Sequence, residues 1–123
     1  MTGIRFLLDT KVVIGLLKAY EPAIKLVEAA GFVLEESAVS QITRMELLGH
    51  PKITQDDERL IQLFLSECQV LLLNERIEVK ATHLRRSGLL KLPDAIVAAT
   101  AIINDLRLLT LDKKLALTLA NIK

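Results

Sequence analysis

Aromatic residues are scarce in this chain: they make up 3% of its 123 residues, with one Tyr and no Trp. A platform that stacks several single-stranded bases on aromatic rings is therefore not expected. Long apolar runs are also missing. No segment approaches the roughly 18 apolar residues of a membrane span, and no basic stretch leads into an apolar one as in a secretory signal. We therefore expect a cytoplasmic protein.

The chain also lacks an excess of charge of either sign, and it has only one cysteine. The net charge is +1, so no overall basic field attracts nucleic acid, and phosphate contacts would have to come from a local patch. The single cysteine, Cys68, cannot form an intrachain disulfide and has no CxxC or His–Cys spacing around it for zinc. Its place in a helical apolar pattern predicts a buried small hydrophobic residue rather than a reactive thiol.

The motifs of several large enzyme classes do not occur. Neither GxxxxGK[ST] nor GxGxxG is found, which disfavours nucleotide-binding enzymes, and the GxSxG elbow of hydrolases is absent. What the chain has is 51% apolar and 25% charged residues, which suits one folded domain over residues 1–123. A mean hydropathy of +0.39 is high for a small domain and predicts that a second subunit or a partner covers some apolar surface.

Strand and helix patterns alternate along the chain. The first strand, residues 4–8, carries consecutive apolar residues, which is typical of a central parallel strand covered on both faces. A second strand is expected over 32–39, at or near a sheet edge because Glu35 and Glu36 interrupt it. Later strands are expected over 70–73 and 106–110. Helices are expected over 12–20, 22–30, 41–48, 54–69, 75–88, 93–104 and 113–120. The pattern predicts an α/β fold with a parallel sheet, helices on both faces and a site at the carboxyl ends of the strands.

Acidic residues stand where those carboxyl ends are expected. Asp9 ends the first strand, Asp112 follows the last strand by two residues, and Asp94 lies in the first turn of its helix. Each has an ordinary alternative interpretation: Asp9 and Asp112 as helix caps, and Asp94 as a charge that complements the helix dipole.

Glu46 is the fourth acid of interest. It falls beside the apolar stripe of Ile42, Met45 and Gly49 rather than on the opposite face of the helix, and a carboxylate on an inward face needs a partner. A salt bridge to Arg44 or to a lysine of another helix is the alternative. Four acids at one edge would repel each other unless a cation sits among them. Oxygen ligands without nearby His or Cys favour Mg²⁺ or Mn²⁺ over zinc.

The residues around these acids resemble a known family. The motifs LLDTxVxIxLL at Asp9, SxxTxxELLG at Glu46, LPDAIVAATA at Asp94 and LLTxD at Asp112 occur in this order over nearly the whole chain. Together they resemble the PIN domain, and specifically the small VapC-type toxins of toxin–antitoxin pairs. The segment at Asp94 is the most specific part of the likeness.

The resemblance implies a PIN-like three-layer α/β/α sandwich around a central, mainly parallel sheet of four or five strands. It also implies a metal-dependent endoribonuclease, the toxin of a type II toxin–antitoxin pair, that works as a homodimer on RNA and is inhibited by a small antitoxin protein. By this likeness the site that holds Mg²⁺ or Mn²⁺ consists of Asp9, Glu46, Asp94 and Asp112, with Thr10 and Thr110 beside it.

Lys11 departs from the family pattern, which usually has a small polar residue two positions after the first Asp. This cation either competes with the metal or holds the scissile phosphate. The alternative function is therefore a catalytically weakened PIN module that binds RNA or a protein. The basic residues available to RNA phosphates are Lys11, Arg44, Lys52, Arg85, Arg86 and Lys91. The densest group is Arg85, Arg86 and Lys91, for which a solvated helix end is the alternative interpretation.

A phosphoacceptor receiver domain has a similar length and an acidic Mg²⁺ site. It predicts a pair of adjacent acids near the first strand and an Asp at the end of the third. Here Asp9 stands alone and the third strand leads into Leu73 and Asn74, so the receiver ranks well below the nuclease.

Overall fold

A four-stranded parallel sheet forms the centre of the computed structural model, which describes residues 3–122. Its strands run in the order β3-β2-β1-β4, and their bounds are β1 (Phe6–Leu8), β2 (Ser37–Ser40), β3 (Gln69–Leu71) and β4 (Arg107–Leu109). Because every pairing is parallel, all four strands end at the same edge of the sheet. The predicted α/β class and parallel sheet are confirmed, with four strands.

Helices fill the connections between the strands. In the described part of the chain they are α1 (Thr10–Leu17), α2 (Glu21–Ala29), α3 (Gln41–Leu48), α4 (Gln55–Glu67), α5 (Glu75–Arg86), α6 (Leu92–Ile103) and α7 (Lys113–Ile122). Three of the expected caps are present. The Ser40 hydroxyl accepts from the Ile42 N–H, Thr54 forms a capping box with Asp57, and the Asn74 side chain accepts from the Ile77 N–H.

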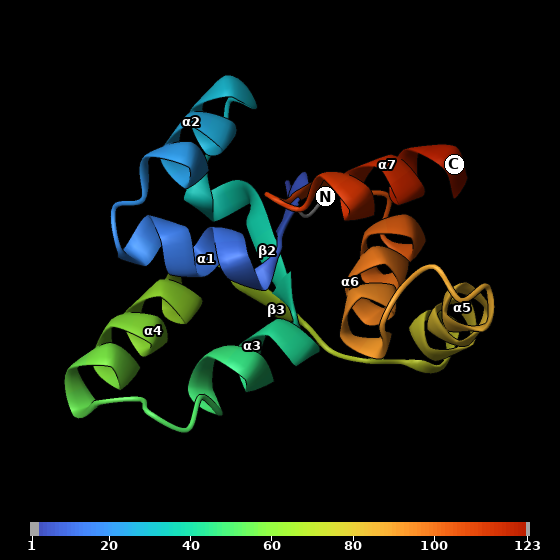
Figure 1. Cartoon of the computed structure of the whole chain (residues 1–123). Coiled ribbons are helices and arrows are strands. Elements are labelled where there is room, and N and C mark those ends of the chain that lie inside the picture. The colour runs from blue at the N-terminus through green and yellow to red at the C-terminus, as the bar shows by residue number, and fades with distance from the viewer. Residues whose placement is uncertain (1–2, 123) are drawn as a thin grey trace.

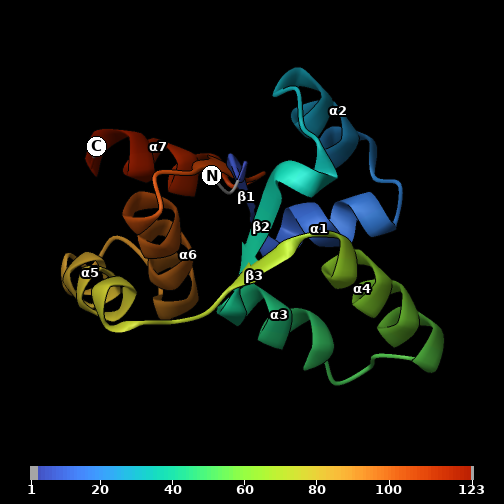
Figure 2. The same ribbon diagram turned by 180° about the vertical axis from the view of Figure 1, so that it is seen from behind.

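The helices make two layers around the sheet. Figure 1 shows α1, α2 and α4 on one side of the strands and α5, α6 and α7 on the other, and Figure 2 shows the same arrangement from behind. Successive side chains of β1 point to opposite faces of the sheet, so the strand contributes to the core on both sides. Phe6 and Leu8 pack with α1, α2 and α4, whereas Leu7 packs against α6. The buried alanines of α6 leave little side-chain bulk, so this helix can lie close to the sheet.

The second strand is shorter than its sequence predicts, while its expected place at or near a sheet edge is confirmed. Residues 34–36 form a short 3-10 helix, η1 (Leu34–Glu36), and β2 begins only at Ser37. The strand has no polar middle, all four of its residues are buried, and it lies inside the sheet next to the edge strand β3. The carboxylates of Glu35 and Glu36 stay outside the sheet because they precede the strand.

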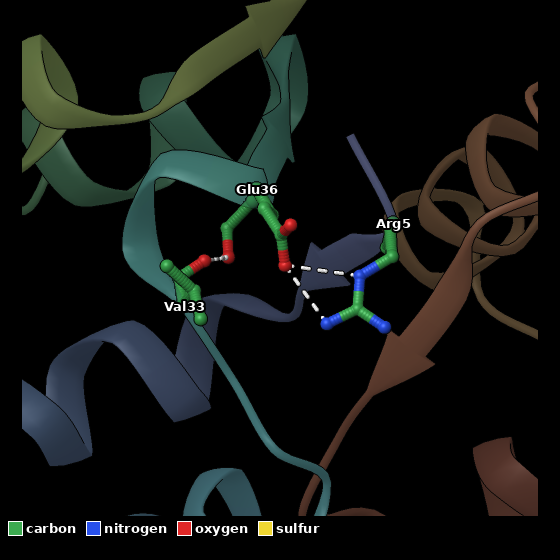
Figure 3. Close-up of polar contacts among 4 residues, drawn as sticks. Arg5, Val33 and Glu36 are labelled. Carbon is green, nitrogen blue, oxygen red and sulfur yellow. Dashed lines mark hydrogen bonds and ion pairs between the residues drawn. The ribbon is translucent and has the colours of Figure 1, made fainter. Parts of the chain in front are cut away.

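An ion pair ties η1 to the start of β1. The Arg5 guanidinium donates to Glu36 Oε1 at 3.0 Å from Nε and lies 2.8 Å from it at Nη2, as Figure 3 shows. The Arg5 backbone N–H also donates to the Glu36 carbonyl at 2.8 Å. The Val33 carbonyl accepts from the Ser37 hydroxyl at 2.9 Å. These contacts lie at the amino ends of β1 and β2.

Cys68 is half-buried rather than fully buried. Its thiol packs against the core on the α4 side and lies 3.9 Å from the Leu65 carbonyl. Burial raises the pKa of the Cys68 thiol to about 11, which keeps it protonated and unreactive at neutral pH. Between residues 3 and 122, no helix is long and apolar enough to cross a membrane.

Candidate active site

Asp9 lies at the carboxyl end of β1 and caps α1. It is 7% exposed, and both of its carboxylate oxygens accept hydrogen bonds: Oδ1 from the Thr10 N–H at 2.8 Å, and Oδ2 from the Thr110 hydroxyl at 2.7 Å. Both donors are uncharged. The interpretation of Asp9 as a helix cap is confirmed. It is compatible with a role in the site, because capping fixes the carboxylate at the strand end.

Thr110 connects Asp9 to the last helix. Its hydroxyl donates to Asp9 and accepts from the Asp112 N–H at 3.0 Å, so both roles of that oxygen are filled. Asp112 in turn accepts from the Leu115 N–H at 3.1 Å, as a cap of α7 does. A polar position after β4 thus joins two acids that are more than 100 residues apart in the sequence.

Glu46 is joined to the start of α1. The Thr10 hydroxyl donates to Glu46 Oε1 at 2.7 Å and lies 3.0 Å from the Thr43 hydroxyl. One hydroxyl has one proton, and the carboxylate is the stronger acceptor, so Thr43 supplies the proton of the second contact. Thr43 is fully buried, and its hydroxyl holds that of Thr10 by this hydrogen bond. It stands in the SxxTxxELLG motif three residues before Glu46, the only sequence signal of its role.

The inward face of α3 is not the one that the sequence predicts. Thr43 and Leu47 are its buried residues, whereas Met45 of the expected apolar stripe is 58% exposed. Glu46 is itself an exposed residue at the border of the buried face. The alternative interpretation, a salt bridge from Glu46 to Arg44 or to a lysine, is not found in the part of the chain that is described; Glu46 accepts from the Thr10 hydroxyl instead.

Asp94 lies in the first turn of α6, half-buried. Burial raises the pKa of its carboxyl above the usual 3.8, and the negative charges of Asp9, Asp112 and Glu46 raise it further. Lys11 acts in the opposite direction. Asp9, Asp112 and Glu46 therefore each lie within electrostatic range of Asp94. Among residues 3–122, none of the four acids pairs with a basic side chain within 4.0 Å.

The donor chemistry of this edge fits a hard divalent cation. Its ligands are carboxylate oxygens, and each hydrogen-bonded oxygen of Asp9 and Glu46 keeps a further lone pair. The side chains are not drawn tightly together, however: in residues 3–122 no three Asp, Glu, His or Cys side chains stand close enough to hold a metal ion as they are. An ion would have to draw the carboxylates inward.

The basic residues expected at RNA phosphates lie at several places on the surface. Lys11 is exposed in the first turn of α1, next to the acids. Arg85 and Arg86 are exposed at the end of α5, and Lys91 is exposed at the residue before α6. Arg44 is partly buried on α3, and Lys52 is exposed between α3 and α4.

Comparisons with known proteins show the family of the chain. A profile of the PIN domain matches residues 6–118. A toxin–antitoxin complex from Klebsiella pneumoniae contains a chain that is 33% identical, with a TM-score of 0.74 over 88% of this chain and 87% of that one. FitAcB from Neisseria gonorrhoeae is 25% identical, with a TM-score of 0.75 over 94% of this chain and 93% of that one.

A third solved structure, VapBC-1 from nontypeable Haemophilus influenzae, is 23% identical, with a TM-score of 0.73 over 96% of this chain and 94% of that one. At this identity the likeness shows the fold alone. The comparison with curated protein sequences found no match. Because the profile spans far more than half of the sequence, from β1 into α7, the chain belongs to the PIN domain family.

Proposed function

We propose that this protein is a metal-dependent endoribonuclease that hydrolyses RNA phosphodiester bonds, and that it is the toxin of a type II toxin–antitoxin pair. The observation that carries the proposal is that Asp94 feels the charges of three carboxylates from separate segments, and that none of these four acids has a basic partner within 4.0 Å in the described residues. Membership of the PIN family supports it, as do the similar chains in toxin–antitoxin complexes.

The proposed ligands divide into two pairs. Asp9 and Asp94 would hold Mg²⁺ or Mn²⁺ directly, while Glu46 binds the ion or orients its water and Asp112 serves an optional second ion. When bound, such an ion lowers the pKa of a water molecule and offsets the charge that builds up on the phosphorus and the leaving oxygen. The hydroxyl of Thr110 holds the Asp9 carboxylate, and that of Thr10 holds Glu46. RNA phosphates would meet Lys11 first, because it is the basic residue that acts on Asp94.

Two protein partners belong to the proposal. A homodimer and a small antitoxin are supported by the similar toxin–antitoxin complexes and by exposed apolar side chains such as Leu63 and Leu117. Light scattering after gel filtration should give twice the mass of the chain, and a protein encoded by an adjacent short reading frame should co-purify with it. A mass of one chain at micromolar concentration would contradict the dimer.

Substitution of the acids tests the nuclease. Asp94→Asn and Asp9→Asn should each reduce RNA cleavage by about a thousandfold, since they remove several kcal/mol of charge stabilisation. The matched control is Asp105→Asn, an exposed aspartate in the turn between α6 and β4 whose left-handed φ of 52° suits Asn. It should cleave as the wild type does. Activity that survives in both site variants, with unchanged circular dichroism, would contradict the proposal.

Thermal unfolding tests the metal. Mg²⁺ or Mn²⁺ at a hundred times its dissociation constant should stabilise the fold by about 2.7 kcal/mol and raise the melting temperature, because only the folded edge brings the ligands together. Asp94→Asn should remove most of this response and Asp105→Asn none of it. An unchanged melting temperature in the wild type would count against a metal site.

A catalytically weakened module is the second candidate function, and Lys11 is the observation that favours it. This exposed cation partly offsets the rise in the pKa of Asp94, so it already supplies part of the positive charge that an ion would bring. Lys11→Asn should tighten Mn²⁺ binding in calorimetry if the lysine competes with the ion. Reduced cleavage without tighter binding would instead place Lys11 on the phosphate. Membership of the PIN family excludes the phosphoacceptor receiver.

A further inference from the structure

A groove of about 690 Å³ runs along α1 on the side that faces the loop after β4. Its lining includes Lys11, Ile14, Lys18, Tyr20, Leu111 and Asp112. Lys11 and Asp112 also belong to the acidic edge, so the groove is continuous with the site. Its volume lies in the roughly 300–1,000 Å³ range of ligand pockets.

Tyr20 is held in place by the way α1 ends. Ala19 takes the left-handed conformation with a φ of 54°, and the Tyr20 N–H then donates to the Gly15 carbonyl at 2.7 Å. The ring lies against the flank of α1: a Cβ atom added to Gly15 would be 3.4 Å from Tyr20 Cδ2. The side chain is nevertheless 53% exposed. A fixed and half-exposed ring loses little conformational freedom when a flat ligand stacks on it.

The charged side chains that line the groove are two lysines and two acids, of which Asp112 belongs to the acidic edge. Lys11 and Lys18 are seven residues apart, so they lie on the same face of α1, roughly 10 Å apart along the axis. Within residues 3–122, neither forms an ion pair. Glu21 also lines the groove, but its carboxylate lies 3.9 Å from Lys25. Unpaired cations along an apolar floor suit a polyanion that carries flat bases.

We infer that this groove binds the single-stranded RNA next to the scissile phosphate, with Lys11 and Lys18 on successive phosphates and one base stacked on Tyr20. The inference rests on the proposed function, since it takes the acidic edge as the place of cleavage. Only one ring is involved, in keeping with the scarcity of aromatic residues. Base stacking on an aromatic side chain tolerates any sequence, so the groove would position the strand rather than select a base.

Tyr20 is the only tyrosine in the chain and there is no tryptophan, which permits a direct measurement. Protein labelled with 3-fluorotyrosine should give a single fluorine NMR resonance. A mixed-sequence RNA hexamer, added without divalent metal so that it is not cleaved, should shift this resonance. A hexamer that lacks bases should leave it in place. An unmoved resonance at RNA concentrations that saturate the protein by fluorescence anisotropy would overturn the inference.

Variants give a second and independent test by anisotropy with the same hexamer. Tyr20→Ala should weaken binding about tenfold, whereas Tyr20→Phe, which keeps the ring, should change it less than about twofold. Lys18→Gln should weaken binding and reduce the salt slope by about one, as the loss of one phosphate contact does. The matched control is Lys80→Gln, because Lys80 lies on α5, forms no ion pair within residues 3–122 and does not line the groove. It should bind as the wild type does. Equal binding by all four variants would overturn the inference.

These measurements separate the groove from the nuclease. RNA binding that depends on Tyr20, in a protein that cleaves no RNA with any divalent metal, would support the groove and contradict the proposed function. Cleavage with a wild-type KM in both Tyr20→Ala and Lys18→Gln would leave the nuclease standing and overturn the groove. A resonance that moves with protein concentration alone would show that a second copy of the chain covers the ring, and would also overturn it.

Discussion

Charged side chains have different partners at the two edges of the sheet. At the amino edge, the exposed Arg5 guanidinium makes two contacts with Glu36 and lies 4.7 Å above the Phe6 ring. At the carboxyl edge, Asp9 and Glu46 are bonded to neutral hydroxyl and N–H groups. Opposite charges are matched at one edge, while like charges are gathered at the other. The carboxyl edge therefore keeps a repulsion that a bound cation would relieve.

The largest expected effect on stability comes from the removal of a neutral hydrogen-bond donor, Thr110, at the carboxyl edge. Thr110→Val removes the hydroxyl bonded to the buried Asp9 carboxylate and leaves the Asp112 N–H without its acceptor. We expect a loss of about 2 kcal/mol in the free energy of unfolding, measured by urea denaturation, because buried polar groups lose their partners. Thr82→Val, which removes an exposed hydroxyl bonded within α5, is the matched control and should cost less than about 0.5 kcal/mol.

The double variant sharpens this prediction. In an Asp9→Asn background the oxygen facing Thr110 is no longer charged, so Thr110→Val should cost less than it does in the wild type. Equal costs in the two backgrounds would show that Thr110 acts through packing and not through Asp9.

A smaller effect is expected at the amino edge. The Arg5 and Glu36 side chains are 57% and 37% exposed, so solvent and salt weaken their attraction. Glu36→Gln should lower the free energy of unfolding by about 0.5 kcal/mol at low salt and by less at high salt. A loss above about 2 kcal/mol would mean that this edge, too, depends on a buried interaction, and the contrast between the two edges would fail.

The smallest expected effect has the opposite sign. Asp94→Asn removes one of four mutually repelling charges, so it should raise the free energy of unfolding by about 0.3 kcal/mol without metal, a value kept low by solvent screening. Added salt should shrink this gain. If the substitution destabilises the metal-free protein, repulsion does not govern the carboxyl edge.

The stability of the wild type and that of Asp94→Asn should depend differently on pH, because the pKa of Asp94 is raised in the folded protein. Between the unfolded value of 3.8 and the higher folded value, the folded state binds more protons than the unfolded state. The contribution of Asp94 to stability therefore falls as the pH rises through this window. Measured by urea denaturation, the free energy of unfolding of the wild type should rise relative to that of Asp94→Asn as the pH is lowered from neutral toward 3.8. A constant difference between the two proteins would contradict the shift.

Much of this architecture is local and therefore readable in the sequence. Ser40, Thr54 and Asn74 begin helices because their side chains accept from N–H groups two or three residues ahead. The apolar run before Asp9 makes β1, and the small apolar residues after Asp94 make the buried α6. The order of the acidic motifs along the chain was sufficient to predict the PIN family.

Other features depend on segments that meet only in the folded chain. The sequence did not indicate that Thr43, buried in α3, supports Thr10 thirty-three residues away, or that the inward face of α3 is Thr43 and Leu47 rather than Met45. The boundary of β2 was wrong because Glu36 pairs with Arg5 outside the sheet. Tyr20 was expected only as the last residue of the first helix, whereas α1 ends at Leu17.

The sequence by itself determined the helices, the parallel sheet and the strand ends from which Asp9 and Asp112 project, since caps and apolar runs act over a few residues. Only the tertiary structure decided which neutral donors hold each carboxylate, how closely the four acids approach, and that Lys11 and Tyr20 share one groove. The reason is physical: hydrogen bonds and charge repulsion depend on distances between segments, and those distances are fixed only when α1, α3, α6 and the β4–α7 loop pack around the sheet.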